Sequence, residues 1–329
     1  MQGRAALARP HDAFFELPPR MSRATATFVA GLVALICGAV YRATMLPGVD
    51  LGDTPSFQTM GGSALISPRD AYPLYFALSA PFTWWTADPA HGMNLASATF
   101  GALACGALVL VAFELAGSLP AAVAAAAVFA GSFTFWSQAV IAEVYTLHVL
   151  WVLLVLLAVF AWERHSSPLR LALFFLVYAI GFGNHLTMIV LMPGLVVFLL
   201  ASVPGGPRAM LTPRVLALAT ACAAAGALQY AWPMRTLLID PVSPSSAWEA
   251  LRWFWFDVTK QDWRDTMLGE LPGVMAGERV RMYRFDLHQQ FGWWPVVTAA
   301  VGVAVLVRRA PRRAALLLLL TGTPTLTCQ

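Results

Sequence analysis

The chain has 329 residues, of which 59% are hydrophobic and only 12% are charged, and its mean hydropathy is +0.67. This composition excludes an ordinary soluble domain, because several segments run for roughly 18 residues or more nearly without charge. The net charge of +4 comes from arginines near the ends of apolar segments, and no basic stretch is interleaved with aromatics. A nucleic-acid partner is therefore not expected.

Continuous apolar runs predict an all-α polytopic membrane protein, whereas a β-barrel would need alternating strand-length segments. The four cysteines lie in apolar segments and lack the spacing of a metal site, so neither a disulfide framework nor a metal is predicted. Of the 21 basic residues only Lys260 is a lysine, which suggests a GC-rich coding sequence and hence a bacterial inner membrane protein.

The chain begins with residues 1–24, which are rich in arginine and proline and are interpreted as a basic cytoplasmic tail. The segment 73–85 is too short to cross a bilayer and is predicted to be an interfacial or re-entrant helix in the first external loop, residues 46–92. Longer apolar segments predict about nine transmembrane helices. They lie at 25–45, 93–116, 119–136, 144–162, 169–183, 186–203, 215–232 and 294–307, and the last begins at Ala314.

Charge sorting favours a cytoplasmic N-terminus. With that orientation every short basic loop faces the cytoplasm, as the positive-inside rule requires. Thirteen of the 17 acidic residues then lie outside, in the first external loop, in the turn 137–143 and in the long loop 236–292. The sequence therefore predicts an acidic extracytoplasmic face.

Six short motifs follow one another in this order: GDTPSFQ at 52–58, AYPLY at 71–75, NLASATFGAL at 94–103, FWSQAVIAEVYTLH at 135–148, GFGNHLTM at 181–188 and DVTKQDWRDTM at 257–267. Together they resemble the successive motifs of the protein O-mannosyltransferase-like family of GT-C membrane glycosyltransferases. The resemblance implies a GT-C-like core at 25–235, an external aromatic-rich loop at 236–292 and further helices at 293–329. The chain stops within an apolar run, so it is interpreted as truncated.

The resemblance also implies the reaction, in which a hexose such as mannose moves from a polyprenyl phosphate to a hydroxyl of a protein or glycan acceptor. Such an inverting transfer needs a general base for the attacking hydroxyl and donors for the departing phosphate. Because the phosphate is already a good leaving group, no metal or other cofactor is required. The partners implied are the lipid-linked donor, the acceptor and the surrounding membrane lipids.

By resemblance the general base is Asp53, although Gly52-Asp53-Thr54-Pro55 also fits a turn and a helix N-cap. Glu143 is the second catalytic candidate, to hold a sugar hydroxyl or orient a basic partner, and a cap at a helix N-terminus is its alternative. Asn184 and His185 lie at an external junction, where polar side chains favour substrate binding over simple exposure.

The long loop combines tryptophans and phenylalanines with acids and a few cations, which is typical of a helix at the headgroup level. It is interpreted either as an aromatic belt or as a cover over the lipid donor, with Lys260 or Arg264 reaching the phosphate. Gln58 and Tyr72 of the matching motifs complete the predicted substrate-binding residues, together with Asp70.

The chain departs from the family pattern at two places near the predicted site. Ser56 replaces a second acid, and Pro68-Arg69 replaces a His-Pro pair, so Asp70 is interpreted either as a substitute polar group or as the mark of altered acceptor choice. Two other classes remain as alternatives: a non-catalytic or truncated protein of the same fold, and a transporter. The apolar centres of the spans argue against a transporter.

Overall fold

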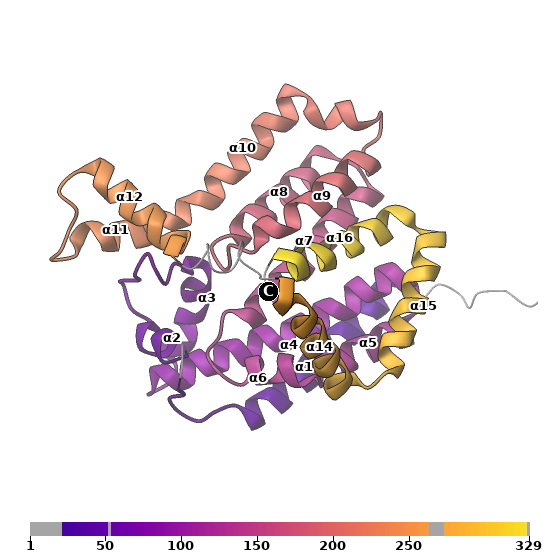
Figure 1. Ribbon diagram of the computed structural model, residues 1–329, viewed down its shortest axis with the longest axis horizontal. Helices are drawn as coiled ribbons and strands as arrows, with labels where there is room; N and C mark the ends of the chain where they lie inside the picture. Colours follow the sequence, from indigo (N-terminus) through magenta and orange to yellow (C-terminus); the bar gives the residue numbers. More distant parts are fainter. Residues whose placement is uncertain (1–21, 52–53, 263–272, 328–329) are drawn as a thin grey trace, which may run out of the picture.

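The computed structural model describes residues 22–51, 54–262 and 273–327, and every regular element in these ranges is a helix. The predicted all-α fold is therefore confirmed for this part of the chain. Figure 1 shows a bundle of long helices, with α11 (Ala231–Ile239) and α12 (Ala247–Val258) forming an arm at one side. Most of the predicted basic tail, residues 1–21, lies outside the described ranges.

The helix at the centre of the bundle is α4 (Pro89–Ala116), which is also the most deeply buried of the long apolar helices. Its start is fixed by Asp88, whose Oδ1 accepts a hydrogen bond from the backbone N–H of Ala90, and by Pro89 in the first turn. It ends at Gly117, which has a φ of 68°. Around it pack α1 (Arg23–Thr44), α5 (Leu119–Ala130) and α7 (Tyr145–Arg164).

Small residues allow α1 and α4 to approach closely. A Cβ atom placed on Gly106 of α4 would lie 2.8 Å from the carbonyl oxygen of Ala30 and 3.1 Å from the Cβ of Ala34. Without a hydrophobic driving force between helices in lipid, such close backbone packing supplies much of the association energy. Glycine at this position is therefore a packing requirement.

We expect Gly106→Val to lower the free energy of unfolding by about 1–3 kcal/mol, because a backbone carbonyl cannot move without shifting α1. Thermal unfolding of the detergent-solubilised protein measures the effect. The matched control is Gly31→Ala on α1, where an added Cβ meets nothing within 4 Å. An unchanged midpoint for Gly106→Val would contradict the close contact.

The described residues contain four helices long and apolar enough to cross a membrane, or up to six if each of two bent pairs is one span. The predicted count of about nine spans is therefore not confirmed. The segment 119–136 was expected to be one continuous span, but it consists of α5 and α6 (Phe133–Ala139), which meet at 69°. The break falls at Gly131 and Ser132, where the Ser132 N–H and hydroxyl turn back to the Phe129 carbonyl.

The remaining helices have the following bounds: α2 (Thr54–Met60), α3 (Pro73–Trp84), α8 (Pro168–Gly181), α9 (Met188–Ser202), α10 (Pro213–Ala227), α14 (Gly273–Phe291), α15 (Trp294–Arg309) and α16 (Pro311–Thr327). The short helix predicted at 73–85 is α3, and its interfacial position stays a prediction. The predicted span at 215–232 continues through a 3₁₀ turn into α11, so α12 and α14 lie in the segment that was predicted to be a long external loop.

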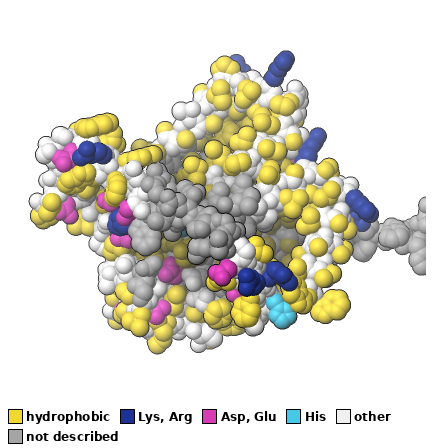
Figure 2. Space-filling view, viewed as in Figure 1, with side chains coloured by type: hydrophobic (Ala, Val, Ile, Leu, Met, Phe, Trp, Pro, Cys, Tyr) yellow, Lys and Arg dark blue, Asp and Glu magenta, His cyan; other side chains and the backbone are white. Residues whose placement is uncertain are grey.

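An ion-pair cluster joins four helices at the end of the bundle opposite the arm. Glu114 of α4 pairs with Arg23 at 3.0 Å and with Arg164 at 2.9 Å, and Arg313 of α16 pairs with Glu163 of α7 at 2.7 Å. Figure 2 shows Lys and Arg where α10 begins and where α15 meets α16. On the arm that contains α12, Asp and Glu lie next to further Lys and Arg.

Candidate functional site

The residue that precedes α7 is anchored on the central helix. The buried Ser97 hydroxyl of α4 accepts a hydrogen bond from the backbone N–H of Glu143 and donates one to its carbonyl oxygen, both at 3.1 Å. The Tyr75 hydroxyl of α3 lies 3.3 Å from Ser97 Oγ. Three helices therefore fix the backbone from which the Glu143 side chain projects.

The carboxylate of Glu143 is turned toward α2. Glu143 is only 9% exposed, and its Oε1 accepts a hydrogen bond of 3.2 Å from Thr54 Oγ1. Thr54 opens α2 and is the first described residue after Gly52 and Asp53. Asp53, the predicted general base, lies outside the described residues, so its role stays a prediction. The N-cap of α7 is Val144, one residue later than the predicted cap.

Gln58 and Asn94 hold the segment that leads out of α1. Gln58 Nε2 donates to Asn94 Oδ1 at 2.9 Å and to Gly48 O at 3.1 Å, and Asn94 Nδ2 donates to the carbonyl oxygens of Leu46 and Gly48. Both side chains are almost fully buried. In the described structure Gln58 therefore positions backbone next to α2, and the prediction that it binds substrate is not tested.

Tyr72 and Lys260 meet although 188 residues separate them in the sequence. The Lys260 ammonium donates a hydrogen bond of 2.7 Å to the Tyr72 hydroxyl and lies 4.9 Å from the centre of the Tyr72 ring. Lys260 follows the end of α12 with a φ of 45°, and its N–H donates to the carbonyl oxygen of Asp257, as in a left-handed cap at a helix C-terminus. This turn ends α12 and brings the Lys260 side chain to Tyr72.

Asn184 connects this pair to the start of α7. The Nδ2 of Asn184 donates a hydrogen bond of 3.2 Å to the carbonyl oxygen of Val144, and its Oδ1 is buried without a hydrogen-bond partner. The preceding Gly183 accepts a hydrogen bond from the backbone N–H of Leu74, one residue into α3. A Cβ at Gly183 would collide with the side-chain amide of Gln229, which would have to move.

His185 lies between Tyr72, Tyr145 and His148, with ring centres 6.0, 5.9 and 5.1 Å away. Its burial, together with the neighbouring His148 ring and the Lys260 ammonium, lowers the pKa of His185 to about 3. The imidazole is therefore neutral at physiological pH. It shares a hydrogen-bonded hydroxyl, that of Thr187, with His148.

Arg69 and three acids form a separate, more exposed cluster. Arg69 pairs with Asp262 at 2.7 Å and with Asp257 at 3.9 Å, and the hydrogen bond to Asp262 raises the pKa of Arg69. Asp70, the third acid, follows Arg69 in the chain, and its charge also helps to raise the pKa of Arg69. The predicted role of Asp70 is not tested. Arg264, the alternative phosphate ligand, lies outside the described residues.

Within the described ranges no group of three or more His, Cys, Asp or Glu is arranged to hold a metal.

The structure thus brings four predicted residues together at one end of the bundle: Tyr72, Asn184, His185 and Lys260. Glu143 lies beside them, because Asn184 is bonded to the residue that follows it. Sequence reasoning missed Ser97 and Asn94, which anchor the site from α4. Their signal was present as two polar side chains three residues apart in an otherwise apolar helical segment, which places them on one face.

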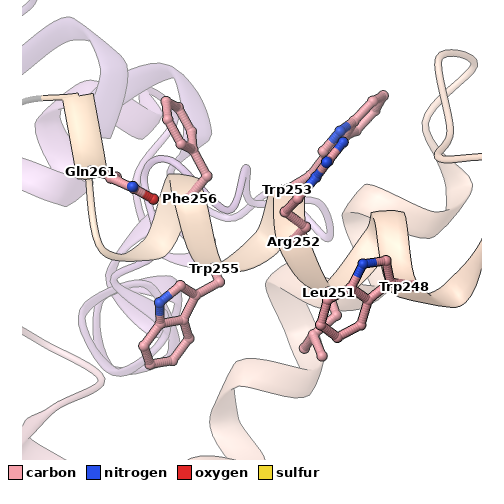
Figure 3. A pocket seen from close by; sticks show the side chains of 7 residues that line it. All are labelled: Trp248, Leu251, Arg252, Trp253, Trp255, Phe256 and Gln261. Atoms are coloured by element: carbon pink, nitrogen blue, oxygen red, sulfur yellow. The ribbon is translucent and has the colours of Figure 1, made fainter.

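Helix α12 carries an exposed aromatic surface next to Lys260. Trp248 is 74% exposed and Trp255 is 61% exposed. Figure 3 shows Trp248, Leu251 and Trp255 on one side of the helix and Arg252, Trp253 and Phe256 on the other. With Gln261 they line a hollow of about 560 Å³. Whether this surface serves as an aromatic belt or as a donor cover is not tested by these contacts.

The described residues form an all-helical bundle that contains helices long and apolar enough to cross a membrane, as in a membrane protein, with a cluster of polar side chains at one end. Residues 70–204 match the family model of the protein O-mannosyl-transferase TMEM260 N-terminal domain. The resemblance predicted from the sequence motifs is thereby confirmed, and the name of that family indicates a glycosyltransferase function of the protein O-mannosyltransferase type. No solved structure matches the chain. The matched part runs from Asp70 through α9 and includes Tyr72, Glu143, Asn184 and His185.

Proposed function

We propose that the chain is an inverting GT-C-type membrane glycosyltransferase that moves a hexose, with mannose as the first candidate, from a polyprenyl phosphate to an acceptor hydroxyl on the extracytoplasmic face. The family match supports the class of reaction. The arginines in the short connections at 164–170, 208–214 and 308–313 support the orientation, because short basic loops face the cytoplasm.

One observation carries the proposal: an acid, a neutral histidine and a lysine gather around the start of α7 from segments far apart in the sequence. Polar groups at the edge of an apolar bundle are costly unless they are paired or used. Asn184 keeps a buried side-chain oxygen without a hydrogen-bond partner. Such a buried polar atom is typical of a site arranged for a ligand.

The transfer itself divides between two groups of residues. Asp53 takes the proton from the acceptor hydroxyl, and Glu143, beside Thr54, is the second carboxylate of this group. As the proton leaves, the oxygen of the acceptor hydroxyl attacks the anomeric carbon of the sugar. The bond from that carbon to the phosphate oxygen breaks, and its electron pair leaves with the phosphate. Lys260 has two ammonium protons beyond the one given to Tyr72, and they are available for charge-assisted bonds to the phosphate.

The test is an assay in membranes that contain the chain. Polyprenyl-phosphate mannose labelled in the sugar is added, and label is measured in the delipidated protein fraction, with polyprenyl-phosphate glucose and a nucleotide-linked mannose as alternative donors. We expect label from the lipid-linked donors above the level of membranes without the chain. Transfer from the nucleotide-linked sugar alone, or none, would contradict the proposal.

Lys260→Met is expected to lower kcat/KM for the lipid-linked donor by about 10- to 100-fold, the loss that corresponds to removing one hydrogen bond to a charged group. Methionine keeps the aliphatic stem and a Cβ, so the cost of the positive φ is the same in both proteins. Arg252→Met is the control, because Arg252 lies on α12, the helix that Lys260 follows, and the contacts of Tyr72 with a cation are made by Lys260. If Arg252→Met lost activity and Lys260→Met did not, the phosphate would have to lie at the aromatic surface of α12.

A further inference from the structure

The hydroxyl of Thr187 bridges two histidines. Thr187 Oγ1 lies 2.8 Å from His185 Nδ1 and 3.1 Å from His148 Nε2. Thr187 and His185 belong to the connection between α8 and α9, while His148 lies one turn inside α7. The three side chains thus link the two elements that border the candidate site.

The direction of this hydrogen-bond chain is set by a backbone group. The N–H of Thr187 points at His185 Nδ1, 3.2 Å away. An amide N–H can only donate, so Nδ1 must present a lone pair. A neutral imidazole with an unprotonated Nδ1 carries its proton on Nε2, and the lowered pKa keeps this imidazole neutral.

The remaining protons follow from the same rule. With Nδ1 of His185 unprotonated, the single hydroxyl proton of Thr187 is donated to it, and the hydroxyl oxygen accepts from the Nε2–H of His148. The other nitrogen of His148, Nδ1, is then unprotonated. It is buried without a partner, and a bare acceptor is tolerated there more readily than an orphaned N–H. The chain runs from His148 through Thr187 to His185.

We propose that Thr187 and His148 are positioning residues that lock His185 as a neutral Nε2–H donor for a phosphate oxygen of the lipid-linked sugar. This inference rests on the proposed function for the identity of the ligand. Nε2 has no hydrogen bond to any described residue, and the ring is flanked by Tyr72 and lies near the Lys260 ammonium. A donor locked in this way suits a ligand whose oxygens only accept.

The assignment also states what His185 does not do. A general base would need a lone pair on the nitrogen that faces the substrate, whereas here the lone pair is committed to Thr187. His185 therefore stabilises the leaving group, and the acceptor hydroxyl must give its proton to a carboxylate. Thr187 was not among the residues singled out from the sequence.

The tautomer can be tested without any activity. The full-length protein, labelled with ¹⁵N in its six histidines, is placed in lipid nanodiscs, and His185→Gln identifies the His185 signals. The titratable and charged groups around the ring are Tyr72, Tyr145, His148 and Lys260. We expect the Nε2–H tautomer, and because burial lowers the pKa of His185 we expect the ring to stay neutral down to about pH 5. An unperturbed histidine, with a pKa of about 6.5, would be mostly charged at that pH. An Nδ1–H tautomer, or an imidazolium at pH 6, would overturn the inference.

The role in transfer is tested with two substitutions at one position. Thr187→Val keeps the shape and removes the hydroxyl, and we expect kcat/KM for the donor to fall about 10- to 100-fold, as when an outer partner that orients a catalytic histidine is lost. Thr187→Ser restores the hydroxyl and should return activity to within about threefold of wild type. Thr99→Val is the control, because its hydroxyl only bonds to its own helix.

The two proposals fail in different ways. If the wild-type chain transfers no sugar from any lipid-linked donor, the proposed function fails, and the histidine spectra still decide the tautomer. If the wild type is active and Thr187→Val matches it, the positioning role fails while the glycosyltransferase assignment stands. A loss in Thr187→Val that Thr187→Ser does not rescue would also count against the hydroxyl.

Discussion

Asp53→Asn is expected to lower sugar transfer by about 100- to 10,000-fold, the contribution that general bases typically make. The substitution separates the two interpretations of this residue. Asparagine caps a helix as well as aspartate does, so a purely structural Asp53 would tolerate the change. An amide cannot take a proton from the acceptor hydroxyl, so a general base would not. Transfer from labelled polyprenyl-phosphate mannose in membranes measures the difference.

The matched control for Asp53→Asn is Asp50→Asn, three residues earlier in the same acidic stretch. Asp50 Oδ1 accepts a hydrogen bond of 2.7 Å from the backbone N–H of Leu51, and its own N–H donates to Gln58. These are the contacts of a turn. We expect Asp50→Asn to keep activity and expression. Full activity in Asp53→Asn, with expression unchanged, would remove Asp53 from the mechanism.

Hydropathy predicted helices well wherever a sequence signal also marked their ends. Pro73 and Pro89 open α3 and α4, and prolines likewise stand in the first turns of α8 and α10. The bend between α5 and α6 was not predicted, because Gly131 and Ser132 are too few and too weakly polar to interrupt an apolar run. The length of an apolar segment indicates how favourably it enters lipid, and it does not indicate whether the helix bends within that segment.

The candidate site was predictable in its parts and not in its assembly. The motifs supplied Tyr72, Glu143, Asn184 and His185 because each lies in a short stretch with a recognisable pattern. The pairing of Lys260 with Tyr72 depends on how the end of α12 reaches the start of α3, which one sequence does not encode locally. The matched family domain ends at residue 204, so Lys260 reaches the site from outside it.

The direction of hydrogen bonding was beyond sequence reasoning altogether. His148 and Thr187 lie in two of the matched motifs, at 135–148 and 181–188, and neither motif indicates that the two side chains are hydrogen-bonded. Only the backbone N–H that points at His185 Nδ1 decides which nitrogen carries the proton. Because a carboxylate must then act as the base, the acids on the α2 side of the site gain importance, and Glu143 is the one whose surroundings are described.

Glu143→Gln is expected to reduce transfer by about 100-fold or more and to leave the fold intact. Glutamine has nearly the same shape, and its amide oxygen can still accept the hydrogen bond from Thr54, while Ser97 holds the backbone as before. The loss of a negative charge near the N-terminus of α7 costs only about 0.3–1 kcal/mol. A structural acid would therefore show a small fall in unfolding temperature and full activity.

The measurement for Glu143→Gln is the initial rate of sugar transfer, read together with thermal unfolding of the same detergent-solubilised sample. Glu249→Gln, an exposed acid in the first turn of α12, is the control for loss of a surface charge. If Glu143 is catalytic or orients the substrate, the rate of transfer falls in Glu143→Gln while the free energy of unfolding stays within about 1 kcal/mol of the wild-type value. If both fall together in Glu143→Gln, the carboxylate holds α2 against α7, and proton transfer must rest on Asp53 alone.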